Sequence, residues 1–496
     1  MNPRLRYWLA GALGLALGVI VAFGIAEESY LVAGLLAVVI AWLVAEWIHG
    51  PLPDAWALAA VLVGYLLGNR GFAQLFLLPN FPLLPAEAAL LVCAPMLVLR
   101  MAFKQSAALT RDGLNYAIFV WMLYGVARLP LDFRYYGFNA LRDFATVYYA
   151  SFFFIAQALC RHEASRVLLR RALTVAFALL PAVSLAFTLF PVFFLTVFTW
   201  NGVPLIYHKD DLIATFLGGG FFYFWAQREA GKGRGWLLLA AICLLMSPSL
   251  NSPRAAMVGI AVVTLVWLLA RRPRLLAFQA GVITLALLAA APVFLLRNRD
   301  LRETKAYSIY EHAVSIFDFQ GRGSYLNAES GDPGDNNRFR LVWWRSVALE
   351  TLEQSPVFGL GFGADLAARF LNDYELADAD DFAARSPHSV IMTVFGRMGG
   401  VGLVLFLAIV VMVARSAWPA FRRWDFPAMG LWSVIGVLGL SACFGVVLEG
   451  PMGAVLFWTV LGMAHDAGRL KEAPALATAP AALQPAEQVG ETPVPL

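Results

Sequence analysis

Residues 388–413, HSVIMTVFGRMGGVGLVLFLAIVVMV, decide the fold class of this chain. Almost every side chain in this stretch is apolar or small, and Arg397 is the only one that carries a permanent charge. The hydrocarbon core of a bilayer is about 30 Å thick, and a helix needs about 20 apolar residues to cross it. The stretch therefore predicts a membrane-spanning helix.

The composition of the whole chain agrees with this prediction. Of its 496 residues, 60% are hydrophobic and only 14% are charged, whereas charged residues make up about 25% of a typical soluble domain. The mean hydropathy of +0.69 is too high for a single buried core. These values exclude a soluble multidomain enzyme and a disordered chain. The net charge of +4 is small and dispersed, which argues against a nucleic-acid partner.

Similar apolar runs recur along the chain. Unpaired backbone polar groups are costly in lipid, so these runs must form helices. Two of the runs are short, and the sequence therefore predicts an all-α polytopic integral membrane protein with about 12–14 transmembrane helices. The runs lie near residues 8–26, 30–48, 55–68, 87–103, 113–128, 143–160, 172–190, 211–227, 235–249, 255–270, 275–296, 388–413, 427–447 and 451–466.

The distribution of Lys and Arg predicts the orientation. Short cytoplasmic loops of membrane proteins are enriched in these residues. With the N-terminus in the cytoplasm, that side receives clusters such as 170–171, 271–274 and 422–423. The opposite short loops hold Arg70, Arg128, Arg134, Arg142, Lys209 and Arg254. Both termini are therefore predicted to be cytoplasmic, with the loop at 297–387 facing outward.

These predictions divide the chain into four parts. Residues 1–296 carry about eleven transmembrane helices. Residues 297–387 form one large, mostly helical loop, and residues 388–466 carry the last three spans. Residues 467–496 form an Ala/Pro-rich cytoplasmic tail, for which the composition predicts disorder.

The outward loop contains a predicted helix and a glycine-rich turn. A turn-rich stretch, SYLNAESGDPGDNN, precedes RFRLVWWRSVALETLEQS, which has an amphipathic pattern and is stopped by Pro356. Glycines 359, 361 and 363 follow. No strand precedes them and no Gly-Lys-Ser/Thr comes after, so a nucleotide-binding loop is rejected in favour of a tight turn after the helix.

The sequence predicts no metal site and no cofactor. The acidic residues between 373 and 381 lack the turn glycine and the closing Glu of a calcium loop, which favours a solvated face. All the cysteines lie in or at the ends of apolar runs, which is typical of small buried side chains. They are Cys93, Cys160, Cys243 and Cys443.

Several cationic residues on the outward side are candidates for a functional site. Arg254 lies at the outer start of a span, where the alternative role is an interfacial anchor. Arg338, Arg340 and Arg345 surround a Trp pair at 343–344, and some of them could simply solvate the helix. His388 begins another span, where it could cap the helix. Arginine binds phosphate oxygens bidentately, and histidine can take a proton near neutral pH, so together they suit transfer from a lipid diphosphate.

These residues occur in strings that resemble the O-antigen ligase/polymerase superfamily of bacterial membrane glycosyltransferases. The strings run in the family's order over about residues 235–410, with Pro253 inserted and Ser389 where Asn is usual. Arg340 keeps the family's Arg-x-x-x-Trp spacing, and Arg338 remains its rival. The strings are Ser252-Pro253-Arg254-Ala255-Ala256, Arg340-Leu-Val-Trp-Trp344, Pro356-Val-Phe-Gly359-Leu-Gly361, and His388-Ser389 followed by Gly399 and Gly402.

The resemblance implies a multi-pass protein of the bacterial inner membrane with a periplasmic active site and a metal-independent, inverting reaction. The donor would be an undecaprenyl-diphosphate-linked glycan. Arg254 with Arg340 or Arg338, and Arg345, would bind the diphosphate, and His388 would orient or deprotonate the acceptor. A ligase would use lipid A-core as the acceptor, and a polymerase a second lipid-linked glycan.

Other functions stay open at this point. A lipid-linked oligosaccharide flippase predicts ionisable residues deep in several spans, for which Arg397 is the main candidate. A structural membrane protein predicts that the arginines are dispensable. Outward aromatic residues either stack on sugars or anchor the protein at the interface. These aromatics are Tyr135, Tyr136, Phe138, Trp343 and Trp344.

Overall fold

The computed structural model describes residues 50–76, 83–102, 110–251, 253–297, 304–318, 333–373 and 385–469, together with Trp42, Asp300, Arg302 and Tyr325. The spans expected at 8–26 and 30–48, apart from Trp42, lie outside these residues. So do most of the acidic cluster and the tail from residue 470. The number of spans and the disorder of the tail therefore stay predictions.

The described part of the chain is almost entirely helical. Its N-terminal half contains α3 (Leu52–Gly68), α4 (Arg70–Ala73), α5 (Pro85–Ala102), α6 (Gly113–Tyr136), α7 (Phe138–Asp143), α8 (Ala145–Tyr148), α9 (Ser151–Cys160), α10 (Glu163–Leu189) and α11 (Asp210–Glu229). Between α10 and α11 lie the π-helix η1 (Phe193–Val197) and a two-stranded antiparallel hairpin, β1 (Thr199–Trp200) and β2 (Val203–Pro204).

The second half continues the helical bundle. It contains α12 (Gly235–Met246), the 3-10 turn η2 (Ser247–Ser249), α13 (Arg254–Leu269), α14 (Arg274–Arg297), α15 (Lys305–Ser315), α16 (Pro333–Gln354), α17 (Ala368–Asp373), α18 (Val390–Arg423), α19 (Phe426–Ala442) and α20 (Pro451–Arg469). These helices lie close to the predicted runs. One expected run, 143–160, is divided among the ends of α7, α8 and α9.

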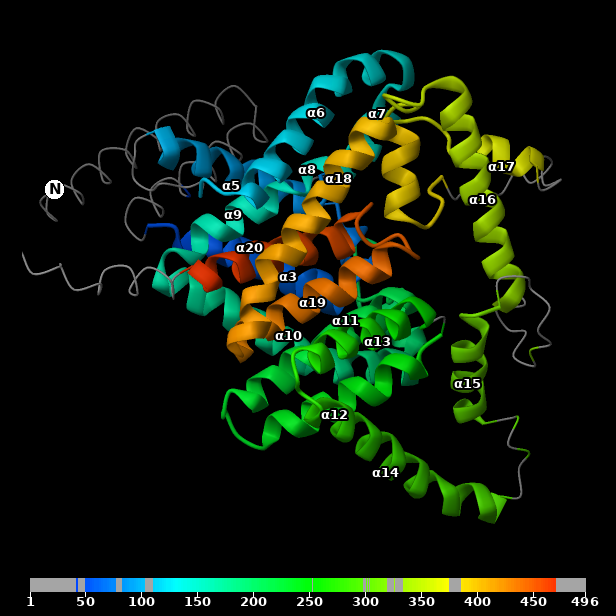
Figure 1. Cartoon of the computed structure of the whole chain (residues 1–496). Coiled ribbons are helices and arrows are strands. Elements are labelled where there is room, and N and C mark those ends of the chain that lie inside the picture. The colour runs from blue at the N-terminus through cyan, green and yellow to red at the C-terminus, as the bar shows by residue number, and fades with distance from the viewer. Residues whose placement is uncertain are drawn as a thin grey trace, which may run out of the picture.

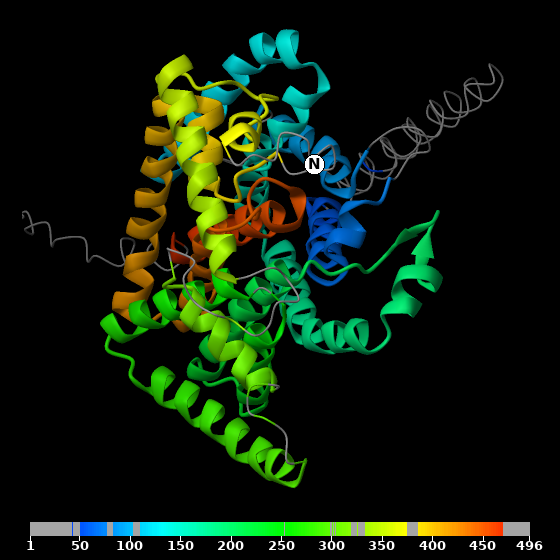
Figure 2. The same ribbon diagram turned by 90° about the vertical axis from the view of Figure 1, so that its right-hand side faces the viewer.

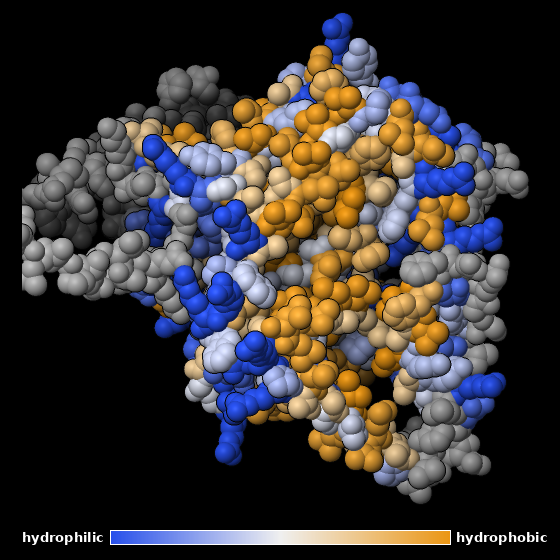
Figure 3. Space-filling view, viewed as in Figure 1, coloured by the Kyte–Doolittle hydropathy of each residue, from blue (hydrophilic) through white to orange (hydrophobic). Residues whose placement is uncertain are grey.

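The predicted all-α polytopic membrane fold is confirmed. Among the described residues, six helical segments are long and apolar enough to cross a membrane, and apolar side chains form a broad band across the face seen in Figure 3. Four shorter apolar helices accompany them. The six are Pro85–Ala102, Gly113–Tyr136, Phe138–Cys160, Glu163–Leu189, Arg274–Pro292 and Val390–Arg423, and the four are Leu52–Gly68, Gly235–Ser249, Arg254–Leu269 and Phe426–Ala442.

Helix α11 lies at the centre of the bundle (Figure 1). Every residue from Leu212 to Gln227 is buried, and the helix packs against α10, α12, α13 and α19. A helix that is apolar all round is stable only when other helices cover it on every side. The first residues of α11 are therefore held in a fixed place relative to the helices that form the site.

Helices α15, α16 and α17 lie together along one side of the bundle, and Figure 2 looks onto that side (Figures 1 and 2). Helix α16 begins at Pro333, inside the stretch predicted to be turns. Proline suits the first turn of a helix because its fixed φ is helical and the missing N–H would be unpaired there anyway. Trp343 is fully buried and packs with Val347, Leu366 and Phe370. This contact ties α16 to α17.

The glycine-rich turn after α16 docks onto a kink in α18. Gly359 and Gly399 both have positive φ values, 77° and 65°. A Cβ added to Gly359 would lie 2.4 Å from the Gly399 nitrogen. Backbone hydrogen bonds join the two segments: Leu360 N donates to Gly396 O (2.7 Å), and Gly400 N donates to Pro356 O (2.9 Å). The prediction that these glycines serve a turn is thus consistent with their geometry.

Replacing Gly359 with alanine should destabilise the protein by about 2–4 kcal/mol, because the new Cβ meets backbone and the φ value disfavours it. Thermal unfolding of the purified protein in detergent measures the change. Gly281→Ala in α14 is the matched control, since a Cβ there meets nothing within 4 Å. Equal melting temperatures for the two variants would contradict the tight backbone contact.

Candidate functional site

A small pocket brings together two of the predicted arginines. Arg254 begins α13, and Arg340 lies in α16. Both side chains line a cavity of about 200 Å³, and they are close enough to repel each other electrostatically. Two like charges held together favour binding of an anion between them. The rest of the lining consists of Ala255, Val258, Ile316, Asn337, Leu341, Trp344 and Phe444.

Arg254 is oriented by Asn337, one helical turn before Arg340. The Arg254 guanidinium donates to Asn337 Oδ1 at 3.3 Å. The amide nitrogen of Asn337 in turn donates to the carbonyl oxygens of Ser315 (2.6 Å) and Asp318 (3.2 Å) at the end of α15. The Asn337 side chain of α16 therefore links the start of α13 to the end of α15 beside the pocket.

The three arginines of α16 do not lie together. Arg338 and Arg345 are seven residues apart, which is about two turns, so they share a face of the helix, and both are exposed. Arg340 lies on the other face, where it is partly buried. Burial lowers the pKa of its guanidinium, and the nearby Asp211 carboxylate opposes that change. None of the ion pairs formed by the described residues includes Arg340.

His388 lies next to this pocket, directly before α18. Its φ of 54° is positive, a strained conformation that histidine tolerates better than most residues. Burial, followed by the charges of Arg340 and Lys209, lowers the pKa of His388 to about 4, although Asp211 acts in the opposite direction. The imidazole is therefore neutral at pH 7 and can accept a proton.

Two tryptophans hold the segment that carries His388. The ring of Trp343 meets the His388 ring edge to face, with 5.7 Å between centroids. The indole nitrogen of Trp344 donates to Pro387 O at 2.7 Å. The suggestion that Trp343 stacks on sugars or anchors the protein at the membrane surface is wrong, because this side chain is fully buried. Tyr135 and Phe138 are 78% and 81% exposed, so both predicted roles remain open for them.

Arg397, the candidate for an ionisable residue within a span, is paired. Its guanidinium lies 3.0 Å from Asp143 Oδ2, and both side chains are buried. Asp143 also accepts a hydrogen bond from Gly363 N in the glycine-rich turn (3.2 Å). Breaking a buried pair leaves an uncompensated charge, which is strongly destabilising. Arg397 thus has a structural environment that fixes the turn onto α7 and α18.

Three residues near the pocket were missed by the sequence prediction. Asn337 binds Arg254, and Lys209 and Asp211 act electrostatically on His388. Lys209 and Asp211 come just before and at the start of a span, which was the one local signal available. Nothing in the sequence indicated that this segment meets residues 340 and 388.

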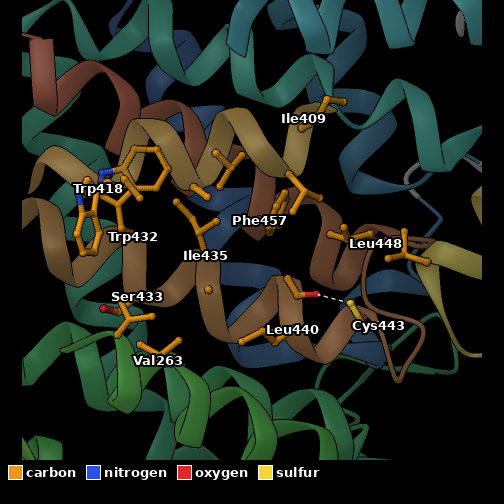
Figure 4. A pocket seen from close by; sticks show the side chains of 18 of the residues that line it. Val263, Ile409, Trp418, Trp432, Ser433, Ile435, Leu440, Cys443, Leu448 and Phe457 are labelled. Carbon is orange, nitrogen blue, oxygen red and sulfur yellow. Dashed lines mark hydrogen bonds between the residues drawn. The ribbon is translucent and has the colours of Figure 1, made fainter. Parts of the chain in front are cut away.

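A larger apolar cavity of about 420 Å³ lies between α13, α18, α19 and α20 (Figure 4). Trp418 and Trp432 line one end, and Cys443 and Leu448 line the other. The lining is almost entirely apolar, so it offers no group that could bind a phosphate or take up a proton. The cysteines are free, and the described residues contain no group of three metal-binding side chains. Of these two cavities, the smaller, cationic one is therefore the candidate for phosphate chemistry.

Fold and site together define a polytopic helical membrane protein with a cation-lined pocket beside a neutral histidine at one end of its bundle. Residues 236–407 match the model of the O-antigen ligase family. The predicted membership of the O-antigen ligase/polymerase superfamily is confirmed over this segment, which contains Arg254, Arg340 and His388. Among curated proteins, none matches the chain.

The family match supports a membrane glycosyltransferase-type function in O-antigen processing, with lipid-linked glycans as substrates and a bacterial membrane as the location. Lys209 and Asp211 lie outside the matched segment.

Proposed function

We propose that this chain is an O-antigen ligase-like glycosyltransferase of the bacterial inner membrane. It transfers a glycan from an undecaprenyl-diphosphate donor to lipid A-core on the periplasmic face, without a metal ion. The observation that carries the proposal is the pocket in which Arg254 and Arg340 face each other beside His388. Arg340 makes no ion pair with a described residue, which suits a cation whose partner is a substrate.

The reaction needs a base for the acceptor hydroxyl and cations for the leaving diphosphate. His388 and the two arginines of the pocket can supply them. The acceptor hydroxyl oxygen attacks the anomeric carbon of the donor sugar and transfers its proton to His388. The bond between that carbon and the diphosphate oxygen breaks, and its electron pair leaves with the lipid diphosphate. Attack opposite the leaving group inverts the anomeric carbon. Arg254 and Arg340 stabilise the negative charge that develops on the leaving diphosphate.

The acceptor is tested by the glycan profile of a strain that lacks the protein. A ligase predicts full-length chains that remain on the undecaprenyl carrier and are absent from lipid A. Complementation with the intact gene should return them to lipid A. Single unpolymerised units on lipid A would show instead that the chain is a polymerase.

Arg340, and not Arg338, should be required for transfer. Arg340→Ala should lower kcat/KM by about 100-fold or more, because a donor of charge-assisted hydrogen bonds to the leaving group is lost. Arg338→Ala should change kcat/KM by less than about threefold, since its side chain is exposed on the other face. The assay uses purified protein, a lipid-diphosphate glycan and lipid A-core, with EDTA throughout. Equal losses in both variants, or dependence on a divalent metal, would contradict the proposed site.

The pH profiles should separate the free protein from the complex. In the free protein the pKa of His388 is about 4, so kcat/KM should not fall between about pH 7 and pH 5. The bound diphosphate favours the imidazolium and raises that pKa, so kcat should begin to fall at a higher pH than kcat/KM. His388→Ala should remove most activity and the acid limb. If kcat and kcat/KM fall together near pH 6.5, His388 is not the base.

A further inference from the structure

Two further charged residues, Lys209 and Asp211, lie at the start of α11 and act electrostatically on His388. Lys209 Nζ lies 3.3 Å from Asp211 Oδ2, and each side chain is about one-third exposed, at 31% and 30%. Exposed pairs of this kind contribute little to stability, typically about 0.2–1 kcal/mol. Stability of the fold is therefore a weak reason for these two charges to lie at this end of the bundle.

The segment that carries Lys209 is held firmly in place. Lys209 N donates to the side-chain oxygen of the buried Asn69 at 3.0 Å. Tyr207 N donates to Gly68 O at 3.1 Å, and Gly71 N donates to Tyr207 O at 3.2 Å. These bonds fix the backbone before α11 to the turn between α3 and α4. The Lys209 side chain is thus presented from a rigid base.

The start of α11 lies close to residues that adjoin the pocket. A Cβ on Gly445, the neighbour of the pocket residue Phe444, would lie 3.8 Å from Asp211 Oδ2. One turn on, Thr215 donates to Ser441 Oγ at 3.1 Å. Asp210 hydrogen bonds with Asn251, just before α13 and Arg254. Asp211 therefore lies close to Gly445, whose neighbour Phe444 lines the cavity together with Arg254 and Arg340.

The charges of Lys209 and Asp211 act on both of the proposed reacting groups. Burial lowers the pKa of Arg340, and the Asp211 carboxylate raises it. After burial and Arg340, the remaining charges that act on the pKa of His388 are Lys209, which lowers it, and Asp211, which raises it. The charges that shift the pKa of His388 therefore come from α16 and from the start of α11.

We propose that Lys209 is a third cation of the diphosphate site, and that it exchanges its Asp211 partner for a phosphate oxygen when the donor binds. The exchange leaves the Asp211 carboxylate to stabilise the positive charge that His388 acquires with the acceptor proton. Lys209 is then a substrate-binding residue, and Asp211 is a positioning residue that acts through His388. The proposal rests on the proposed function, because it assumes that a lipid diphosphate occupies the pocket.

The exchange couples donor binding to proton transfer. In the empty site, Lys209 offsets the charge of Asp211, and the pKa of His388 stays low. Once Lys209 binds phosphate, both the diphosphate and Asp211 favour the imidazolium. His388 thereby becomes a stronger base only when a donor is present, which limits wasteful deprotonation of water or acceptor.

Binding of undecaprenyl diphosphate in detergent, followed by tryptophan fluorescence, tests the role of Lys209. Lys209→Gln should weaken binding about tenfold or more, which is the loss of one charge-assisted hydrogen bond. Lys209→Arg, which keeps the charge, should bind within about threefold of the unaltered protein. The matched control is Lys232→Gln, because Lys232 follows the opposite end of the same helix. Unchanged binding by Lys209→Gln would overturn the proposal.

Asp211→Asn tests the exchange itself. The variant should bind undecaprenyl diphosphate at least as tightly as the unaltered protein, because Lys209 has lost its competing partner. Its kcat should fall, and the acid limb of kcat should move to lower pH, because His388 loses a stabilising carboxylate. If Asp211→Asn weakens binding as much as Lys209→Gln, the pair only holds the loop and the proposal fails. If Arg340→Ala binds as well as the unaltered protein, the proposed function fails instead.

Discussion

The close backbone contact between Gly359 and Gly399 is the constraint on which the site depends. Each residue has a positive φ, and neither position has room for a Cβ. The contact joins the turn after α16 to the kink of α18 through several backbone hydrogen bonds. Arg340 lies on the first of these helices, and His388 directly precedes the second. The backbone contact fixes these two helices relative to each other, and the contacts of Trp343 with His388 and of Trp344 with Pro387 O join them next to the site.

Buried charges reinforce the same contact. Asp132 accepts from Phe362 N at 2.8 Å and from Arg128 Nε at 3.0 Å, while Asp143 accepts from Gly363 N and pairs with Arg397. Each carboxylate thus binds both a guanidinium and the backbone of the glycine-rich turn. These charges are compensated within the protein, in a chain of which only 14% of the residues are charged. Arg340 lines the pocket and forms none of these ion pairs, which fits the proposed role of a substrate-binding cation.

Local features of the sequence predicted much of this. Apolar length located the helices, and the resemblance to the O-antigen ligase/polymerase superfamily, through the spacing Arg340-x-x-x-Trp344, favoured the arginine that lines the pocket. The sequence could not decide against Arg338 or Arg345, because that choice depends on which face of α16 packs against the bundle. The sequence also assigned Trp343 to a surface role. The residues around a Trp pair in an exported loop do not indicate whether a second helix covers it. The approach of α11 to the pocket depends on packing between distant helices, and no local pattern encodes it.

The electrostatics of the site follow from like charges that lie close together. Arg254 and Arg340 line one pocket, and burial, Arg340 and Lys209 lower the pKa of His388. The repulsion between these positive charges is unfavourable, and a doubly charged diphosphate that binds between them relieves it. Part of the binding energy of the lipid diphosphate is therefore expressed as a change in the basicity of His388, and not only as affinity. On the proposed mechanism, the basicity of His388 therefore rises when the donor diphosphate enters the pocket, at the point where the acceptor proton has to be taken up.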